Sequence, residues 1–273
     1  MKTIVITGAS SGIGKATAIL FSKKGWNVAA TMRYTTTSSL FDGYPSIRSY
    51  FMDVLDKDSM DACIQQILTD SGRIEVLVNN AGVYETGPCE GTSQELTDRL
   101  IHTNIRGVAY ATQSVLPHFR QNKGGIIVLV SSVAGRAVFP FQSLYHMTKW
   151  AIEGFGEGLR YELNALNVRV KSYAPGVVKT NLWDELDRHS SISYPPEYDQ
   201  KFKHWLSYLK GNVEKGTSPE QDAEAIYELV MDNKDTFYYS SDFNTKMAAF
   251  LHRFLPVNIF QKMMSKLSGV SWK

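Results

Sequence analysis

Cysteine is scarce in this sequence, which contains only Cys63 and Cys89 among its 273 residues. Two thiols are too few for the framework of several disulfides that stabilises small secreted domains. Neither cysteine stands near a histidine at a spacing typical of a metal site. The sequence therefore argues against a disulfide-stabilised fold and predicts no metal centre.

Long apolar runs and a strong net charge are also missing. No stretch reaches the roughly 18 apolar residues of a membrane-spanning helix. The apolar run at residues 3–7 is too short for the core of a signal peptide, so we expect a cytoplasmic protein. A formal net charge of +2 is too small for the basic surface that nucleic acids bind, so we expect no nucleic-acid partner.

Short β-branched runs alternate with longer helical patterns along the chain. The expected strands are residues 3–7, 27–32, 47–52, 74–79, 125–131, 168–173 and 236–240. The expected helices are residues 13–24, 57–70, 93–119, 143–166 and 219–231. This alternation predicts an α/β fold, a Rossmann-type doubly wound parallel sheet with helices on both faces. Such a sheet binds ligands at the carboxyl ends of its strands, and 273 residues suit a single domain.

A glycine-rich turn of sequence TGASSGIG, residues 7–14, joins the first expected strand to the first expected helix. Gly8 permits a tight turn, Gly12 lets the backbone approach a pyrophosphate, and Gly14 allows the helix to pack closely on the strand. The amino end of the helix then points at the phosphates. The residues expected to form this cradle are Gly8, Ser10, Ser11, Gly12, Ile13 and Gly14.

Arg33 directly follows the second expected strand, which ends at Met32. An acidic side chain at this strand end would bind the ribose 2′-hydroxyl of NAD, whereas an arginine suits the 2′-phosphate of NADP. The hydroxyls of Ser10 and Ser11 are available to the same phosphate. The sequence therefore predicts NADP as the preferred cofactor and NAD as the less suitable one.

Tyr145 and Lys149 share one face of an expected helix, because residues four apart lie on the same side. A free phenol has a pKa of about 10, which a neighbouring ammonium and the positive nicotinamide of the oxidised cofactor would lower. Ser132 lies just past the fifth expected strand, where a hydroxyl can donate to a developing alkoxide. These three residues are candidates for general acid/base catalysis at a carbonyl or alcohol.

The chain resembles the short-chain dehydrogenase/reductase family in its Gly-x-x-x-Gly-x-Gly spacing, its Tyr-x-x-x-Lys pair and the sequence Asn79-Asn80-Ala81-Gly82. The resemblance implies that the catalytic residues are Asn104, Ser132, Tyr145 and Lys149. It also implies that further cofactor contacts come from Asp53, Val54, Asn80, Ala81, Gly82, Tyr145, Lys149, Pro175, Gly176, Val178 and Thr180. By the same resemblance, the Asn104 amide would hold a water that relays protons from Lys149, which would also bind the nicotinamide ribose.

Other roles follow from the same resemblance. Asp53 would contact the adenine amino group, and the neighbouring Asp56 is available to cap the following helix. Val178 and Thr180 would hold the nicotinamide carboxamide and so decide which face of the ring meets the substrate.

Two segments interrupt the alternation, residues 182–216 and residues 242–273. The first stands where the family has its substrate lid, and its aromatic residues would either wall a pocket for a bulky apolar substrate or pack the lid on the body. These aromatic residues, with two that follow Ser132, are Trp183, Tyr194, Phe202, Trp205, Tyr208, Phe139 and Phe141. The apolar and basic tail is open to four interpretations: an interfacial membrane helix, a subunit contact, a flap over the pocket, or packing on its own domain.

The expected function is hydride transfer between NADP(H) and a carbonyl or secondary alcohol, with Tyr145 as the general acid/base. The alternative is an NADP-binding sensor on the same fold that does not catalyse a reaction. An epimerase would have a different glycine spacing and a larger carboxyl-terminal region, and an enoyl reductase would space its Tyr and Lys more widely. The resemblance also implies a homo-oligomer, a dimer or tetramer, formed through residues 143–166.

Overall fold

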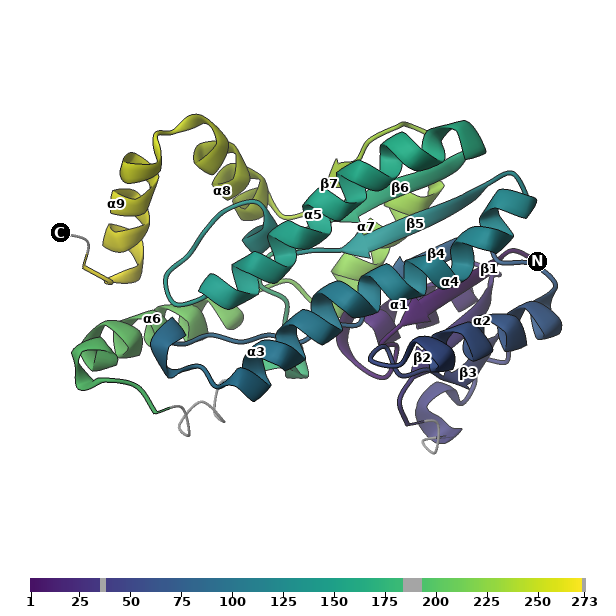
Figure 1. Cartoon of the computed structure of the whole chain (residues 1–273), viewed down its shortest axis with the longest axis horizontal. Helices are drawn as coiled ribbons and strands as arrows, with labels where there is room; N and C mark the ends of the chain where they lie inside the picture. Colours follow the sequence, from purple (N-terminus) through teal and green to yellow (C-terminus); the bar gives the residue numbers. More distant parts are fainter. Residues whose placement is uncertain (35–37, 184–192, 272–273) are drawn as a thin grey trace.

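The computed structural model describes residues 1–34, 38–183 and 193–271 (Figure 1). Within these ranges one parallel sheet has the strand order β3-β2-β1-β4-β5-β6-β7. The strands are β1 (Thr3–Thr7), β2 (Asn27–Met32), β3 (Ile47–Phe51), β4 (Val76–Asn79), β5 (Gly125–Val130), β6 (Val168–Tyr173) and β7 (Tyr238–Tyr239). The order reverses between β1 and β4, which is the point where a doubly wound sheet forms its ligand crevice.

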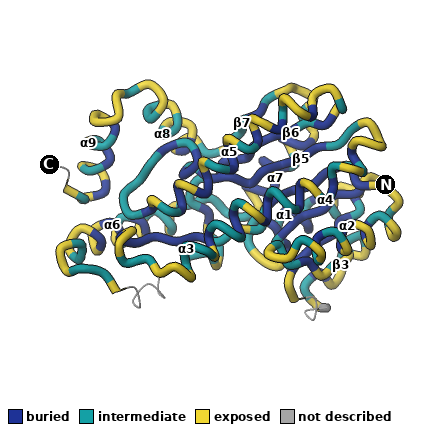
Figure 2. Tube along the Cα trace, in the orientation of Figure 1, coloured by how far each residue is buried: buried dark blue, intermediate teal, exposed yellow. Residues whose placement is uncertain are grey.

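Helices cover both faces of the sheet, as predicted. One layer contains α1 (Gly12–Lys23) and α7 (Pro219–Met231), and the other contains α2 (Lys57–Ser71), α4 (Val108–Gln121) and α5 (Ser143–Leu163). Alternate residues of β5 face the two layers, with Ile127 and Leu129 on one side and Ile126 and Val128 on the other. Strands β1, β2, β4, β5 and β6 are mostly buried between them, whereas the edge strands β3 and β7 are partly exposed (Figure 2). Each buried aliphatic side chain contributes about 1.5–3 kcal/mol, so the two apolar layers stabilise the sheet.

The observed strands begin and end within two residues of the predicted ones. The fourth was expected from residue 74, but β4 begins at Val76 because the Ile74 N–H donates to the His118 imidazole. The last was expected at 236–240, but only Tyr238 and Tyr239 pair with β6 at the sheet edge. Short runs at the edge of a sheet present few unpaired backbone groups.

The prediction of a single helix over residues 93–119 was wrong. The structure divides it into α3 (Gln94–Ile101), the π-helical turn η3 (His102–Gly107) and α4, which continues to Gln121. A π-helical turn inserts one residue into the helical ladder and often marks a functional site. The helix predicted for 143–166 is α5 followed by a 3₁₀ turn, η5 (Asn164–Leu166).

The segments that interrupted the alternation contain further helices. Residues 182–216 include η7 (Pro196–Tyr198) and α6 (Asp199–Val213), and residues 184–192 lie outside the described ranges. The tail forms α8 (Phe243–Phe254) and α9 (Val257–Ser268), which make a hairpin at the end of the molecule opposite the amino terminus (Figure 1). Other short 3₁₀ turns are η1 (Ser38–Phe41), η2 (Cys89–Gly91) and η4 (Val133–Gly135).

A side-chain cap, a proline and a glycine set the ends of α8 and α9. The Asp242 carboxylate accepts a hydrogen bond from the Thr245 N–H at 2.7 Å and so caps α8, which ends just before Pro256. Pro256 starts α9, and Gly269 ends it with φ at +70°, a left-handed conformation that favours glycine. Over the described ranges, we find no helix with both the length and the apolar character needed to cross a membrane.

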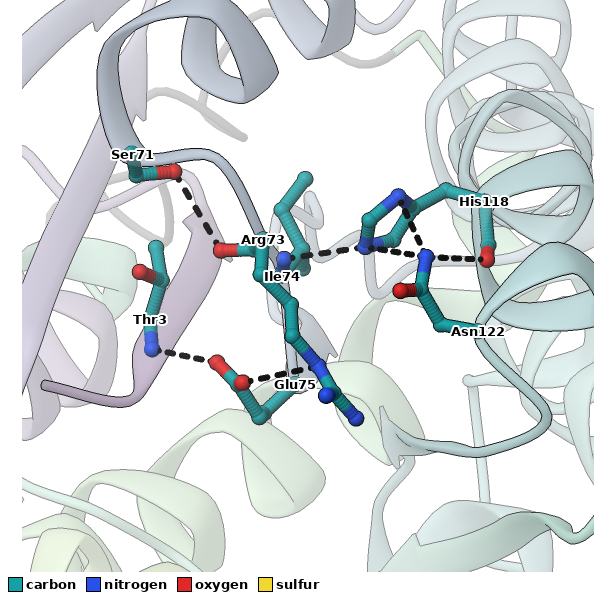
Figure 3. A network of polar contacts seen from close by, with 7 residues as sticks. All are labelled: Thr3, Ser71, Arg73, Ile74, Glu75, His118 and Asn122. Atoms are coloured by element: carbon teal, nitrogen blue, oxygen red, sulfur yellow. Dashed lines mark hydrogen bonds and ion pairs between the residues drawn. The ribbon is translucent and has the colours of Figure 1, made fainter.

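A polar network holds together the amino ends of β1 and β4 (Figure 3). The Glu75 carboxylate accepts from the Thr3 N–H at 2.6 Å and pairs with Arg73 at 3.0 Å. From α4, the His118 Nε2 accepts from the Ile74 N–H at 3.0 Å. Burial lowers the pKa of His118, so the folded chain favours the neutral ring that can accept this bond.

We expect His118→Gln to reduce the loss of stability in mild acid. A folded-state pKa below the unfolded value means that the contribution of His118 is present above about pH 6.5 and declines as the pH falls. Urea unfolding at pH 7 and pH 5 will measure the free energy of unfolding, with exposed His204→Gln as the control. A wild-type pH slope in His118→Gln would show that other groups dominate.

Candidate active site

A cavity of about 950 Å³ lies at the carboxyl ends of the strands. It is lined at one end by the glycine-rich turn and at the other by side chains from α6, α8 and α9. Every site residue predicted from the sequence lines this cavity except Gly14 and Asn104, which lie directly behind its wall. Residues spread from Gly8 to Thr180 therefore come together at one place in the fold.

The glycine-rich turn is pressed against the turn at residues 79–82. Gly8 has φ at +66° and Gly12 at +52°, so both adopt conformations that other residues rarely take. A Cβ on Gly8 would lie 2.9 Å from the Ala81 Cα, and one on Gly14 would lie 2.5 Å from the Asn80 Nδ2. Only glycine permits this approach.

Hydrogen bonds reinforce the contact between the two turns. The Thr7 hydroxyl oxygen accepts from the backbone N–H groups of Asn80 and Ala81, both at 3.0 Å. The Asn80 amide nitrogen donates back to the Thr7 and Gly8 carbonyls at 2.8 Å and 3.1 Å. The Asn80 side chain thus holds the turn in shape, and Asn80 also lines the cavity, so its contact with a cofactor stays a prediction.

Two residues that the sequence predicts as cofactor contacts, Arg33 and Asp53, lie near the ends of β2 and β3. Arg33 is exposed at the end of β2 and lines the cavity beside buried Met32. Asp53 also lines the cavity, and its carboxylate accepts from the Leu55 N–H at 3.0 Å. The cap of α2 is Asp56, whose side chain accepts from the Asp58 N–H, as the sequence allowed.

Ser132 faces the cavity from the start of η4, just after β5, and Tyr145 and Lys149 face it from α5. The Ser132 oxygen accepts from the Ala134 N–H at 3.1 Å, which fixes the hydroxyl at the start of η4. The Lys149 ammonium donates to the Val130 carbonyl at 3.1 Å and lies 5.7 Å from the centre of the Tyr145 ring. All three side chains are more than nine-tenths buried.

Burial is the main cause of the pKa shifts of Tyr145 and Lys149. It raises the pKa of Tyr145 to about 12, opposed by the Ser132 hydroxyl, and lowers the pKa of Lys149 to about 8, opposed by Glu153. The sequence led us to expect that Lys149 and the positive nicotinamide of the oxidised cofactor would lower the pKa of Tyr145, whereas in the protein alone burial raises it. At neutral pH the phenol is therefore protonated and can donate a proton.

His146 and Glu153 brace the helix that carries Tyr145 and Lys149. The His146 imidazole accepts from the Phe139 N–H at 2.8 Å through Nε2, and its Nδ1 lies 2.7 Å from the Ala134 carbonyl. Burial raises the pKa of Glu153, whose carboxylate accepts from the Ser172 hydroxyl at 3.0 Å. Neither residue was assigned a role from the sequence.

Asn104 sits in the π-helical turn η3, behind the cavity wall. Its amide oxygen accepts from the Val83 N–H at 2.9 Å. Its amide nitrogen donates to the Val83 carbonyl at 2.9 Å and to the Thr148 hydroxyl at 3.2 Å. Both amide N–H groups therefore have protein acceptors, so the amide ties the loop after Gly82 to α5. Its expected contact with a water stays a prediction.

The loop at residues 175–180 closes the cavity over the glycine-rich turn. Val178 pairs with Thr217, and the Val178 carbonyl accepts from the Trp183 indole at 2.5 Å. A Cβ on Gly12 would lie 3.1 Å from the Thr180 side chain, so this loop and the first turn of α1 are in contact.

The predicted aromatic residues divide between two roles. Phe139, Trp183, Trp205 and Tyr208 line the cavity, whereas Phe141, Tyr194 and Phe202 pack behind it. Tyr84 was not expected at the site, but it lines the cavity with its ring centre 4.8 Å from that of Tyr145. The Tyr84 hydroxyl accepts from the Gln142 amide at 2.6 Å, so a polar pair borders the apolar wall.

Within the described ranges, no three His, Cys, Asp or Glu side chains lie together in a way that would hold a metal ion.

Comparison with protein families matches residues 2–191 to the short chain dehydrogenase family. The chain is a short-chain dehydrogenase. It is 38% identical over 208 residues to an uncharacterised oxidoreductase of Staphylococcus saprophyticus, covering 74% of this chain and 83% of the relative. It is 31% identical over 227 residues to a 3-ketodihydrosphingosine reductase of Bacteroides thetaiotaomicron, covering 83% of this chain and 82% of that enzyme.

Solved structures place this short-chain dehydrogenase in the same fold. ElxO with NADP bound superimposes with a TM-score of 0.75 at 30% identity, covering 90% of this chain and 99% of ElxO. Other neighbours have been solved with NAD. These structures confirm the predicted family and fold, and they include both forms of the nicotinamide cofactor.

Replacing Gly14 with alanine will test the contact between the two turns. Because the new Cβ would lie 2.5 Å from the Asn80 Nδ2 and from the Gly8 carbonyl oxygen, we expect a loss of about 1–3 kcal/mol of stability. Gly211→Ala is the control, since nothing lies within 4 Å of a Cβ at that exposed position in α6. Urea unfolding measures both, and a Gly14→Ala protein as stable as wild type would contradict the close packing.

Proposed function

We propose that this short-chain dehydrogenase transfers a hydride between NADP(H) and a carbonyl or secondary alcohol of a bulky apolar substrate. The observation that supports this most directly is the shared cavity of Ser132, Tyr145 and Lys149. One end of that cavity is a glycine-lined turn, and the other is walled by aromatic and aliphatic side chains. A polar reactive group and an apolar body would both be accommodated.

The glycine-lined end fits a nicotinamide dinucleotide. The Gly8 and Gly12 backbones leave the space that side chains would fill, and the amino end of α1 faces the cavity without a side-chain cap. Gly8, Ser10, Ser11, Gly12 and Ile13 would hold the pyrophosphate, with Gly14 supporting the turn from behind. The adenosine half would be bordered by Asp53, Val54, Asn80, Ala81 and Gly82, and the nicotinamide half by Pro175, Gly176, Val178 and Thr180. When bound, the cofactor supplies or accepts the hydride.

The catalytic residues of the chain would orient the substrate and move a proton. Ser132 would donate a hydrogen bond to the substrate oxygen, and Tyr145 would give its proton to that oxygen during reduction. Lys149 would bind the nicotinamide ribose and favour the phenolate that remains. Asn104 would act as a positioning residue, since its amide joins the loop after Gly82 to the helix that carries Tyr145.

Arg33 supports the preference for NADP over NAD. Arg33 is exposed at the cavity rim, where β2 ends in Met32, and neither Met32 nor Arg33 is the acidic residue that would favour NAD. A planar guanidinium can grip a 2′-phosphate through two hydrogen bonds.

The outer face of α5 supports assembly into a dimer or tetramer. Met147, Trp150 and Tyr161 are exposed along one stripe of this helix, and Gly154 and Gly158 leave the stripe flat between them. Small residues allow a second helix to approach closely. We further propose one cytoplasmic domain, with residues 182–216 as its substrate lid.

Tyr145→Phe will test the proposed catalysis. Loss of the proton donor should reduce turnover about 10²- to 10⁴-fold, with little change in NADPH affinity. NADPH oxidation is followed with a panel of bulky ketones, and Tyr84→Phe, at a second cavity phenol, is the matched control. Near-normal turnover in Tyr145→Phe would refute the assignment, and a wild-type protein that binds NADPH but turns over no substrate would favour the sensor.

Arg33→Ser will test the cofactor preference. Removal of a charge-assisted hydrogen bond should weaken NADPH binding roughly ten- to a hundredfold and leave NADH binding almost unchanged. Thermal unfolding with each cofactor reports binding, because a ligand of the folded state raises its stability. Arg120→Ser, at an exposed position outside the cavity, is the control. Equal binding of both cofactors by the wild type would overturn the NADP assignment.

A further inference from the structure

The α8–α9 hairpin concentrates positive charge at one end of the molecule. Residues 243–273 contain five Lys or Arg residues and neither Asp nor Glu, although the whole chain has a net charge of only +2. In the described part of the hairpin the basic residues are Lys246, Arg253, Lys262 and Lys266, and all are exposed. This surface is therefore suited to a partner that carries negative charge.

The same hairpin carries an exposed apolar stripe. Phe243, Met247, Phe250 and Phe254 are spaced four, three and four residues apart, which places them on one face of α8. Their side chains are 40–69% exposed. Val257, Ile259 and Leu267 of α9 are exposed as well, so the hairpin holds nearly half of the large hydrophobic side chains exposed in the described residues. Figure 2 shows much of its surface as exposed.

The opposite face of the hairpin is packed and gives it a fixed position. Phe260 and Met264 are buried against Ala137, which follows the Ser132 turn. His252 lies between Trp150 of α5 and Phe260, with ring centres 5.8 Å and 4.9 Å away. Because these contacts anchor the inner face, the outer stripe is presented to whatever lies beyond the molecule.

The cavity reaches the exposed stripe. Met247 and Leu267 both line the cavity and are exposed, at 40% and 59%. Leu251 and Met263 line the cavity between the two helices. An apolar path thus leads from the outer surface of the hairpin toward Tyr145.

An anionic lipid surface suits this combination better than a second copy of the chain. A symmetric contact between two hairpins would bring two groups of like charge together, which is unfavourable. A helix with an apolar face bordered by Lys and Arg lies in the plane of a membrane interface, with the apolar side chains among the lipids.

We propose that the α8–α9 hairpin docks in the plane of an anionic bilayer and that the cavity opens toward the lipid. An apolar carbonyl substrate dissolved in the bilayer then enters between Met247 and Leu267 without crossing water. The docking is inferred from the hairpin alone, whereas the route of the substrate rests on the proposed function.

Vesicle co-sedimentation of the full chain tests the docking. The probes are phosphatidylcholine vesicles with and without phosphatidylserine, at low and high salt. We expect binding to the anionic vesicles only, with weaker binding at high salt. Phe250→Ser should weaken it roughly tenfold or more, and so should Lys262→Gln with Lys266→Gln. Phe51→Ser is the matched control, because Phe51 of β3 and Phe250 are both 57% exposed.

Two further measurements separate the other outcomes. Sedimentation velocity without lipid reports the oligomeric state, and a Phe250→Ser protein that dissociates while wild type fails to bind vesicles would assign the stripe to a second copy.

NADPH oxidation with a water-soluble ketone in the absence of vesicles tests the proposed function separately. Turnover without vesicle binding would overturn the docking, whereas vesicle binding without turnover would overturn the function and leave the docking intact. If Phe250→Ser alters the KM in this lipid-free assay and the wild type does not bind vesicles, we would assign the hairpin as a flap over the pocket.

Discussion

The contact between two turns at the carboxyl ends of β1 and β4 is the constraint on which the rest of the site depends. Four hydrogen bonds cross it from Asn80 and Ala81 to Thr7 and Gly8, and the glycines Gly8 and Gly14 allow the backbones to touch. These strands are neighbours where the sheet order reverses, so the contact also fixes the floor of the cavity. The helix that follows one turn and the loop that follows the other take their positions from it.

From this floor, each further part of the site is held by the part before it. Asn104 fixes the loop after Gly82 and bonds to Thr148 of α5. The same helix presents Tyr145 and Lys149, and His146 ties it to the segment that follows Ser132. A buried polar network of this kind keeps its shape only when all its members have partners. The proposed catalytic side chains therefore lie on rigid elements, while the walls that would contact a substrate come from α6, α8 and α9.

Most of the sheet could be predicted from the sequence, and so could the part of the cavity lining around the glycine-rich turn and Tyr145, because both depend on local patterns. Buried parallel strands are continuous apolar runs, and the glycine spacing reports where backbones must approach closely. Tyr145 and Lys149 were found through their helical spacing. The roles of Asn80 and Asn104 were less accessible, since their partners Thr7, Val83 and Thr148 lie far away in the chain. The π-helical turn also has no sequence pattern that distinguishes it, because the residues around it have the periodicity of a single helix. The tail left four interpretations open, because an apolar and basic segment has the same composition whichever of its faces is buried.

The uneven placement of charge makes this chain electrically polar even though it is almost neutral as a whole. Residues 1–242 contain 24 of the 29 Lys and Arg residues and all 27 Asp and Glu residues, which leaves them net negative, whereas the hairpin is strongly positive. The molecule therefore has a dipole moment directed from its body toward α8 and α9. A dipole of this kind is turned by an electric field before any contact forms, so the chain would approach a negatively charged surface with the mouth of its cavity leading.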